Sequence, residues 1–369
     1  MNRKIIWISP DCFADCDFLP IEGVLSEYDV HWVVQLGNNS RFKECDFEDI
    51  QQRHKNLSIE FIYFKRRARD PRRILEYMKI YRIIKREKAD IVYLNMVPDS
   101  PFFLPMWWRL DKKKTIITAH QGDVHDGFKM KRISKLVRNL AYPYAKTVNM
   151  FSKSQAAIFK KNYPVSHVVT IPLGLKDFGK PTIKAATAED IPVRFLSFGI
   201  INYPKNIDLL IDAACNIYEK GYRGFVISIN GGCQNWDFYQ QKIRYPEIFE
   251  LDIRKIDNDE IPNLFAKAHY FVQPYRIVTQ SGPMKIAFNY NTPVVVSDLP
   301  GFTDETVNGI NGYIFEHENV ESLESQIINV LEKQKEYGAL IERMKLYVDE
   351  NYSSSTIANK YIEMFNEIE

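Results

Sequence analysis

The segment from Tyr270 to Asp298 constrains the fold more than any other part of the chain. Its order is Tyr270-Phe-Val-Gln-Pro-Tyr275, Thr279-Gln-Ser-Gly282, Pro283 to Asn291, and Pro293-Val-Val-Val-Ser-Asp298. Two short apolar runs that flank a small-polar turn and a helix-length segment predict a βαβ unit with parallel strands. Pro283 suits the first turn of the helix, because its missing N–H group costs nothing there.

The turn formed by Thr279, Gln280, Ser281 and Gly282 is a candidate phosphate site. Gly282 lets a ligand approach the backbone closely, and the free N–H groups of a first helical turn favour an anion. A simple N-cap, in which Thr279 or Ser281 accepts a backbone hydrogen bond, explains the same residues. Both interpretations stay open on the pattern alone.

Strand and helix patterns alternate twice along the 369 residues, which are enough for two domains of ordinary size. Expected strands lie at 5–8, 31–35, 59–64, 89–94, 115–120, 147–151, 168–171, 194–199, 225–230, 249–251, 270–275 and 293–298. Expected helices lie at 73–88, 132–145, 154–162, 206–220, 260–268, 283–291, 320–337 and 354–368. The pattern predicts an α/β protein with two Rossmann-like, doubly wound domains that face a central cleft.

The boundaries between the domains follow from a loss of periodicity. Residues 176–192 carry Gly179, Pro181 and Pro192 among polar residues, which is typical of a linker. We therefore expect a first domain at 1–175, a linker at 176–192 and a second domain at 193–345. The C-terminal helix, within 346–369, could return to the first domain.

The composition, with 45% hydrophobic and 26% charged residues, is that of a soluble globular protein. No apolar run reaches the roughly 18 residues that span a bilayer, and the apolar part of the N-terminus is too short for a secretion signal. The five cysteines form no CxxC pair. Free thiols in a reducing compartment are therefore expected, which indicates a cytoplasmic protein.

Positive charge is concentrated in the first half, although the net charge is only +2. Residues 65–88 contain eleven Lys or Arg, which suggests an anionic ligand or surface on that side. Residues 101–114 mix aromatic side chains with lysines, and this mixture suits peripheral contact with an anionic membrane at its inner face. Burial of the aromatics in the core is the alternative. Nucleic-acid binding is not expected, because no recognised module is present.

Six segments, taken in order, resemble one family of enzymes. They are Thr118-Ala-His120, Ile171-Pro-Leu-Gly174, Phe198-Gly-Ile-Ile-Asn-Tyr-Pro-Lys-Asn206, Ile261 to Tyr275, Thr292 to Gly301 and Asn308-Gly-Ile-Asn-Gly-Tyr-Ile-Phe315. Their order and spacing resemble the glycosyltransferases of the GT-B fold, family 4 (glycosyl transferases group 1). The turn at Thr279 to Gly282 is similar to the branch of that family with a Thr-Gln-Ser-Gly phosphate turn.

The resemblance implies a metal-independent, hexosyltransferase-like enzyme that retains anomeric configuration. The first domain would bind a saccharide or lipid-linked acceptor, and the second would bind a UDP- or GDP-type nucleotide sugar as co-substrate, with no cofactor. Cell-surface polysaccharide biosynthesis is the implied setting.

This chain also departs from the family pattern. The usual pair of glutamates falls on Val278 and Ile286, and the acidic residue of this branch falls on Ile277. Ile200 stands where the family has an Arg. These departures keep two alternatives open: a catalytically weakened homologue that binds a sugar nucleotide or partners an active transferase, and a sugar-nucleotide epimerase.

The chemistry of sugar transfer assigns roles to individual residues. Negative charge develops on the leaving diphosphate and needs a cation or aligned dipoles. The diphosphate group would be held by Gly199, Asn202, Lys205, Thr279, Gln280, Ser281 and Gly282. The nucleoside would contact Asn230, Gly231 and Gly232. By resemblance His120 would orient the donor sugar, and Asp123 and His125 would face the acceptor.

Each of these assignments has a plainer alternative. Lys205 could be a solvated loop lysine, His120 a structural histidine, and Asn230 to Gly232 an ordinary turn. No metal site is expected, because Asp257-Asn-Asp259 is better explained as the N-terminal cap of the helix that follows it.

Overall fold

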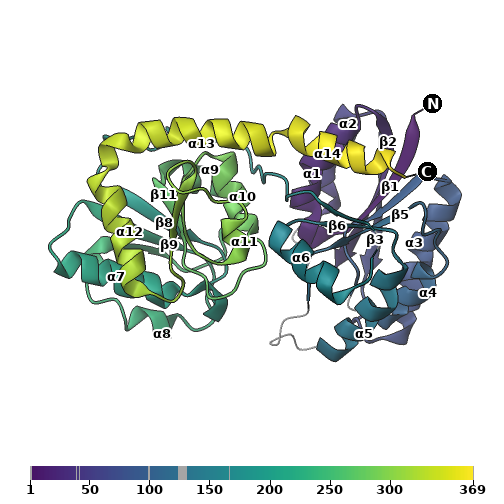
Figure 1. The fold of residues 1–369 in the computed structure, drawn as a ribbon, viewed down its shortest axis with the longest axis horizontal. Helices are drawn as coiled ribbons and strands as arrows, with labels where there is room; N and C mark the ends of the chain where they lie inside the picture. Colours follow the sequence, from purple (N-terminus) through teal and green to yellow (C-terminus); the bar gives the residue numbers. More distant parts are fainter. Residues whose placement is uncertain are drawn as a thin grey trace. The chain divides into compact units, whose positions relative to one another are not determined.

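The computed structural model describes residues 2–38, 40, 42–98, 100–123, 131–165 and 167–368. Contacts divide the chain into two compact units, which Figure 1 shows as two sheets flanked by helices. Unit 1 comprises Met1–Gly174 and Ser354–Glu369, and unit 2 comprises Leu175–Ser353. The predicted fold class, two Rossmann-like α/β domains, is confirmed.

The sheet of unit 1 has seven parallel strands in the order β3-β2-β1-β4-β5-β6-β7. Their bounds are β1 Arg3–Pro10, β2 Tyr28–Gly37, β3 Leu57–Phe64, β4 Ile91–Leu94, β5 Thr115–Ala119, β6 Thr147–Met150 and β7 His167–Thr170. The central strands are buried along nearly their whole length. Near-continuous apolar runs are expected of a parallel sheet covered by helices on both faces.

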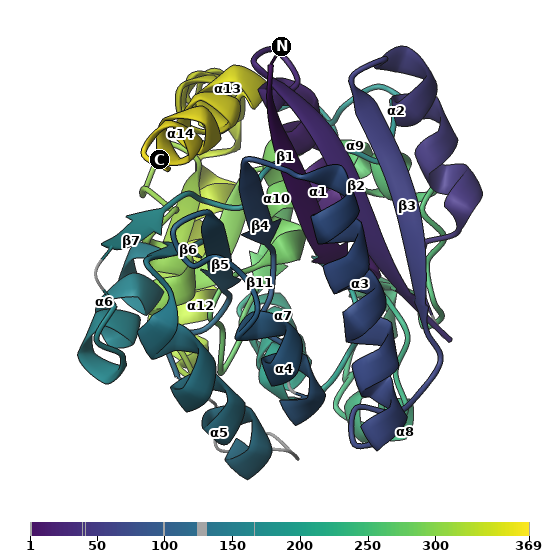
Figure 2. The same ribbon diagram turned by 90° about the vertical axis from the view of Figure 1, so that its right-hand side faces the viewer.

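The helices of unit 1 are α1 Ala14–Val24, α2 Glu48–Arg53, α3 Ile74–Glu87, α4 Leu104–Trp107, α5 Lys131–Ala141, α6 Lys153–Asn162 and α14 Ser354–Asn366. α3 buries Tyr77, Ile80, Ile83 and Ile84 at helical spacing, with charged residues on its outer side. Figure 2 shows α3, α4 and α5 side by side on one face of the sheet.

The C-terminal helix α14 packs against α1 at the other face of the unit 1 sheet. A Cβ atom added at Gly23 would lie 2.4 Å from the Cβ of Ala358, so Gly23 permits the close approach of the two helices. The rings of Tyr361 and Phe365 pack on Trp7, with centroids 5.2 and 6.1 Å apart. The last helix is therefore part of the hydrophobic core of unit 1.

Unit 2 contains six parallel strands in the order β10-β9-β8-β11-β12-β13. The strands are β8 Val193–Phe198, β9 Phe225–Asn230, β10 Phe249–Asp252, β11 Tyr270–Gln273, β12 Val294–Ser297 and β13 Gly312–Phe315. The helices are α7 Ile207–Glu219, α8 Trp236–Gln240, α9 Ile261–Lys267, α10 Gly282–Asn289, α11 Pro300–Thr303, α12 Val320–Glu332 and α13 Tyr337–Tyr352. β11, α10 and β12 form the expected βαβ unit.

One predicted helix is wrong in its extent. Instead of running over 320–337, α12 ends at Glu332, and a 3-10 turn at Gln334–Glu336 leads into α13. Most of α13 was not predicted as a helix, because charged residues separate its apolar positions. Those positions, Leu340, Met344, Val348 and Tyr352, recur every fourth residue and are buried.

Residues 176–192 pack along the surface of unit 2. The N–H of Ala186 donates to the carbonyl of Ala266 at 2.8 Å, and the N–H of Thr182 donates to Asn263 Oδ1 at 2.7 Å. Tyr290 donates its hydroxyl to the carbonyl of Gly179 at 2.9 Å. These contacts fix the segment to unit 2 on both sides of its central part.

Candidate donor site and the neighbouring polar network

The carboxyl ends of β8 and β11 lie next to each other in the unit 2 sheet, because the two strands are paired. Ligands of open α/β sheets bind at this edge. The loop after β8, residues 199–206, and the loop after β11, residues 274–281, therefore form the candidate site.

The loop after β8 holds a sharp turn that opens α7. Gly199 has φ +110°, and the 3-10 turn at Tyr203–Lys205 ends at Asn206 with φ +54°. An Asn tolerates this left-handed conformation better than most residues. The Asn206 side chain is buried, and neither of its amide atoms has a hydrogen-bond partner among the described residues.

A chain of hydrogen bonds connects Lys205 to Ser281. Lys205 Nζ donates to the Tyr275 hydroxyl and lies 3.8 Å from the centre of that ring. Gln273 Nε2 donates to the Tyr275 hydroxyl at 2.9 Å and to Ser281 Oγ at 2.6 Å. Two predicted diphosphate residues that are far apart in the sequence are thus brought into one network. Gln273 and Tyr275 were not predicted as site residues.

A lysine, Lys176, lies at the N-terminus of α10. Ser281 Oγ accepts a hydrogen bond from the N–H of Met284 at 3.2 Å, so the N-cap interpretation of Ser281 is confirmed. Lys176 lies over the first turn, where a Cβ added at Gly282 would be 3.0 Å from its Nζ. A helix N-terminus and a lysine both attract an anion. Lys176 was not predicted as a site residue.

Arg276 connects the loop after β11 to the loop after β8 by hydrogen bonds. Its backbone N–H donates to the carbonyl of Pro204, and its guanidinium donates to the carbonyl of Tyr203, both at 2.9 Å. The guanidinium also pairs with Asp208 at the start of α7, at 2.9 Å. Arg276 lies in the loop after the first strand of the βαβ unit, and only its position after that strand could have identified it.

The turn that carries Thr279 lies against α11. A Cβ atom added at Gly301 would lie 2.9 Å from the carbonyl oxygens of Val278 and Thr279. Only a glycine allows these backbones to come so close without a shift. The position of the Thr279 turn therefore depends on Gly301.

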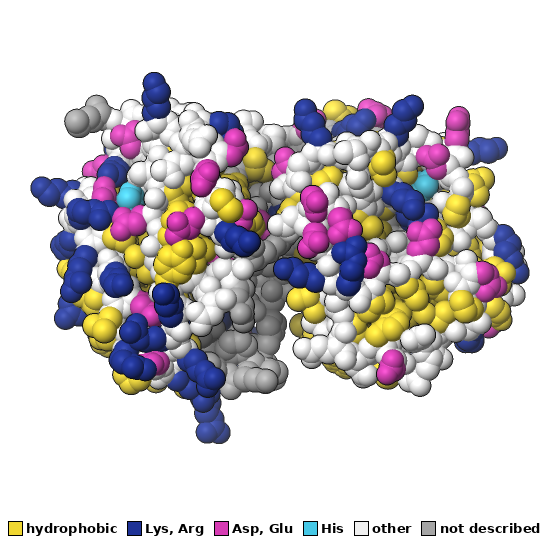
Figure 3. All heavy atoms as spheres, turned by 180° about the vertical axis from the view of Figure 1, so that it is seen from behind, with side chains coloured by type: hydrophobic (Ala, Val, Ile, Leu, Met, Phe, Trp, Pro, Cys, Tyr) yellow, Lys and Arg dark blue, Asp and Glu magenta, His cyan; other side chains and the backbone are white. Residues whose placement is uncertain are grey.

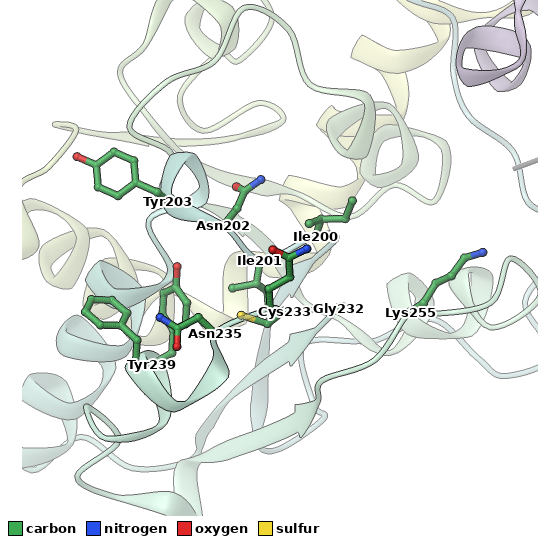
Figure 4. A pocket seen from close by; sticks show the side chains of 11 residues that line it. Ile200, Ile201, Asn202, Tyr203, Gly232, Cys233, Asn235, Tyr239 and Lys255 are labelled. Carbon is green, nitrogen blue, oxygen red and sulfur yellow. The ribbon is translucent and has the colours of Figure 1, made fainter. Parts of the chain in front are cut away.

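A cavity of about 920 Å³ opens beside the loop after β8. Its lining is mainly apolar and aromatic: Ile200, Ile201, Asn202, Tyr203, Gly232, Cys233, Gln234, Asn235, Phe238, Tyr239 and Lys255. Figure 4 shows side chains from the loop after β8 facing those from the segment between β9 and α8. Asn202 and Gly232 thus both line the cavity, whereas Lys205 and the Thr279 turn lie outside the lining.

The predicted nucleoside residues have different surroundings. Gly232 lines the cavity. Asn230 Nδ2 donates to Ser228 Oγ at 2.8 Å inside the sheet, and a Cβ at Gly231 would lie 1.9 Å from the carbonyl oxygen of Gly199. The missing side chain at Gly231 thus lets the loop after β9 approach the loop after β8 closely. The aromatic run after Asn235, which supplies Phe238 and Tyr239, was the signal that could have revealed the cavity.

In unit 1, His120 follows β5, and a hydrogen bond and ring contacts hold it in place. Its Nε2 donates to the carbonyl of Asn95 at 2.8 Å, and its ring stacks on Phe13 with centroids 3.9 Å apart. Burial lowers the pKa of His120 to about 4, so the ring is neutral at pH 7. A neutral ring of fixed orientation can position a polar group but carries no charge.

Asp17 is buried in the same polar network and was not predicted. Asn95 Nδ2 donates to both Asp17 carboxylate oxygens, at 2.7 and 3.0 Å. Desolvation raises the pKa of Asp17 to about 7, although the hydrogen bond from Asn95 opposes the shift. Asp17 thus contacts the side-chain amide of Asn95, and His120 contacts its backbone carbonyl, at the carboxyl edge of the unit 1 sheet.

The remaining predicted residues give less information. Asp123 is exposed on the loop after β5, and His125 lies outside the described residues. Within the described ranges, no group of three His, Cys, Asp or Glu side chains could hold a metal ion. The predicted cap at 257–259 is wrong: Glu260 is the N-cap residue of α9, and its carboxylate accepts from the N–H of Asp257 at 3.1 Å.

The family models match both units. The model for glycosyl transferases group 1 matches residues 180–346, and the model for Glycosyltransferase Family 4 matches residues 26–176. Together the matches span most of the chain. The chain belongs to the GT-B glycosyltransferases.

Known proteins support this membership. A glycogen synthase of Thermodesulfovibrio yellowstonii is 22% identical over 263 residues, which cover 68% of this chain and 50% of the relative. The chain thus spans about half the length of that curated relative.

Two solved structures share the fold. A sucrose-phosphate synthase from Thermosynechococcus elongatus aligns over 99% of both chains with TM-score 0.75 and 13% identity. HepE from Anabaena, in complex with UDP-glucose, aligns over 98% of this chain and 99% of its own with TM-score 0.71 and 14% identity.

Proposed function

We propose that this GT-B protein transfers a sugar from a nucleotide-sugar donor to a saccharide or lipid-linked saccharide acceptor. The observation that carries the proposal is the positive N-terminus of α10. Lys176 lies over its first turn, and Lys205 is joined to Ser281 through Tyr275 and Gln273. A leaving diphosphate would accept the charge and hydrogen bonds that these groups offer.

The cavity beside the loop after β8 supports a nucleoside at the other end of the donor. Its volume, about 920 Å³, lies in the range of small-molecule sites. Exposed aromatic side chains at Tyr203 and Phe238 provide faces on which a base can stack. HepE binds UDP-glucose on the same fold, which makes a UDP-type donor the first to test.

The proposed chemistry uses the residues of this chain without a metal or cofactor. Lys176, Lys205 and the α10 N–H groups supply positive charge where a divalent cation would otherwise balance the diphosphate. His120, neutral and fixed by Asn95, would orient the donor sugar. We propose retention of anomeric configuration and a role in cell-surface polysaccharide biosynthesis, consistent with the family resemblance.

A second candidate function is nucleotide-sugar binding without efficient transfer. Three positions where the family carries acidic residues are apolar here: Ile277 is 52% exposed, Val278 is half-buried, and Ile286 is buried in α10. A chain that keeps the phosphate contacts but lacks these carboxylates would bind the donor and turn it over slowly. This candidate shares the donor site with the first.

Thermal unfolding with nucleoside diphosphates and their sugars tests the donor site. A ligand at about 100 times its dissociation constant adds about 2.7 kcal/mol to the free energy of unfolding. We expect one base to raise the melting temperature of the wild type, and Lys176→Ala and Lys205→Ala to weaken binding about tenfold or more. Lys335→Ala, on an exposed turn, is the control and should behave as wild type.

Product analysis separates the two functions. Transfer of labelled sugar to an acceptor panel supports the transferase, whereas tight binding with no transfer supports the binding protein. A product formed from the donor alone, with an inverted sugar centre, would indicate an epimerase. The absence of any melting shift at millimolar nucleotide would overturn all three.

A further inference from the structure

A second pocket lies in unit 2, at the amino ends of β8 and β11. It has a volume of about 250 Å³ and is formed by the segment before β8, the start of β8 and the end of α9. The candidate donor site lies at the carboxyl ends of the same two strands. Because β8 and β11 are parallel, the pocket and the donor site lie at opposite edges of one sheet. The pocket is therefore separate from the proposed donor chemistry.

Three cations line this pocket: Lys184, Arg194 and Lys267. They come from three segments, because Lys184 precedes β8, Arg194 lies in β8 and Lys267 ends α9. The two lysines are exposed, whereas Arg194 is only 8% exposed. Cations that the fold gathers around a concave surface attract an anion.

The guanidinium of Arg194 is part of the pocket wall. Its Nη1 donates to Glu250 on the edge strand β10. No other hydrogen bond from this guanidinium reaches a residue in the described ranges. A guanidinium carries five N–H donors in a planar fork, which matches the spacing of the oxygen atoms of an oxyanion. Arg194 therefore keeps donors for a ligand.

The ring of His269 fixes the shape of the pocket without adding charge. Its Nδ1 accepts from the backbone N–H of Arg194 at 3.0 Å, and its Nε2 therefore carries the proton and donates to the carbonyl of Thr187, also at 3.0 Å. Burial lowers the pKa of His269, so the ring is neutral at pH 7. These two bonds hold the segment before β8 against the sheet.

Two carboxylates face the three cations. Asp190, in the lining, accepts from the backbone N–H of Thr187 at 2.8 Å and from its hydroxyl at 2.9 Å. Glu250 lies beside the lining, where it pairs with Arg194 and, at 3.7 Å, with Lys267. Its side chain is 46% exposed, so solvent weakens this second pair. Glu250 is thus a competitor of any anion that enters the pocket.

The number and positions of the cations favour a phosphate group. A phosphate has enough oxygen atoms to accept hydrogen bonds from all three cations at once, whereas a carboxylate has two oxygens. On the face of unit 2 drawn in Figure 3, Lys and Arg side chains are mixed with Asp and Glu side chains. A specific anion site on such a surface depends on a local group of cations in a hollow, as in this pocket.

We propose that this pocket is a second anion site of unit 2, which binds a phosphate group through Lys184, Arg194 and Lys267. The bound group joins the segment before β8 to the end of α9 and so stabilises that segment. The proposal goes beyond sugar transfer, because it needs neither a nucleotide sugar nor an acceptor.

Isothermal titration of the full chain with inorganic phosphate, at constant ionic strength, tests the proposal. Lys184→Gln and Lys267→Gln should each weaken binding about fivefold or more. Lys180→Gln removes the same charge from the same segment outside the lining and should leave binding unchanged. Glu250→Gln should strengthen binding, because it removes the competing carboxylate. Titration with glycerol phosphate distinguishes a free phosphate ion from a phosphate that carries an organic group.

Hydrogen exchange resolved by segment locates the bound phosphate. We expect slower exchange at 184–194 and unchanged exchange in the loop at 199–206. Protection confined to 199–206 would place the phosphate at the donor site and overturn the proposal. An equal loss of affinity in Lys180→Gln, equal heats with chloride, or no heat at millimolar phosphate would also overturn it. None of these outcomes bears on the nucleotide experiments that test the donor site.

Discussion

At the residue scale, Ser281 has two roles that can be separated by experiment. It caps α10 and accepts a hydrogen bond from Gln273 in the chain that leads to Lys205. Ser281→Ala should cost about 1 kcal/mol of stability, as the loss of an N-cap does, and should also reduce the melting shift caused by nucleotide. Urea unfolding and thermal shift measure the two effects.

Asn319→Ala is the matched control for the loss of a cap. Asn319 caps α12 by accepting from the N–H of Ser322 at 3.0 Å and is not part of the candidate site. Asn319→Ala should lower the free energy of unfolding by a similar amount and leave the melting shift caused by nucleotide unchanged. An equal loss of the shift in both variants would mean that Ser281 acts on ligand binding only through stability.

Asp17 and His120 give a prediction about pH. The raised pKa of Asp17, about 7 against 3.8, means that the folded state holds a proton that the unfolded state loses, so stability falls as pH rises from about 4 to 7. Asp17→Asn should therefore gain stability relative to wild type over this window, by roughly 4 kcal/mol at most. Urea unfolding at pH 4.5 and pH 8 measures the change.

His120 should behave in the opposite way. Its pKa is lowered to about 4 from 6.5, so the unfolded state takes up a proton first and stability falls as pH drops from 6.5 to 4. His120→Gln should lose this acid sensitivity. A variant whose stability follows the wild-type pH profile would show that the histidine is not desolvated as described.

At the scale of elements, a buried ion pair joins α10 to the loop after α11. Lys285 is fully buried and pairs with Glu305, which also accepts a hydrogen bond from the Tyr352 hydroxyl at 2.5 Å. Tyr352 ends α13, so α10 is fixed to the last helix of unit 2.

Removing one partner of this ion pair should lower the free energy of unfolding. Lys285→Met leaves the Glu305 carboxylate buried without its cation, and we expect a loss of about 3–5 kcal/mol. Lys285→Met combined with Glu305→Gln should recover much of that loss, because no uncompensated charge remains. A double-mutant cycle by urea unfolding measures the coupling, and simple additivity of the two changes would refute it.

The elements also show what the sequence could and could not predict. The βαβ unit at 270–298 and most strands follow from apolar runs, because buried parallel strands are nearly continuously apolar. α13 was missed because its apolar residues are separated by charges. Lys176 and Arg276 were missed because their positions arise from tertiary proximity, and the close approach of Gly231 to Gly199 was missed for the same reason.

At the scale of the whole molecule, the stability of unit 1 depends on the last residues of the chain. The ring of Phe365 packs on Trp7, Tyr28 and Tyr93 in the core of unit 1. Phe365→Ala should destabilise this unit by about 3–5 kcal/mol and leave unit 2 unchanged. Hydrogen exchange resolved by segment should show faster exchange in β1 and β4, but not in β8 or β11.

The return of α14 to unit 1 also sets the order in which a growing chain can finish folding. Unit 2 is a continuous segment, Leu175–Ser353, and all of it is synthesised before α14. Unit 1 has most of its strands early, but its core is completed only by residues 354–369. During synthesis, the unit that is begun first is therefore completed only after α14 has been made, and its Trp7 face stays uncovered until then.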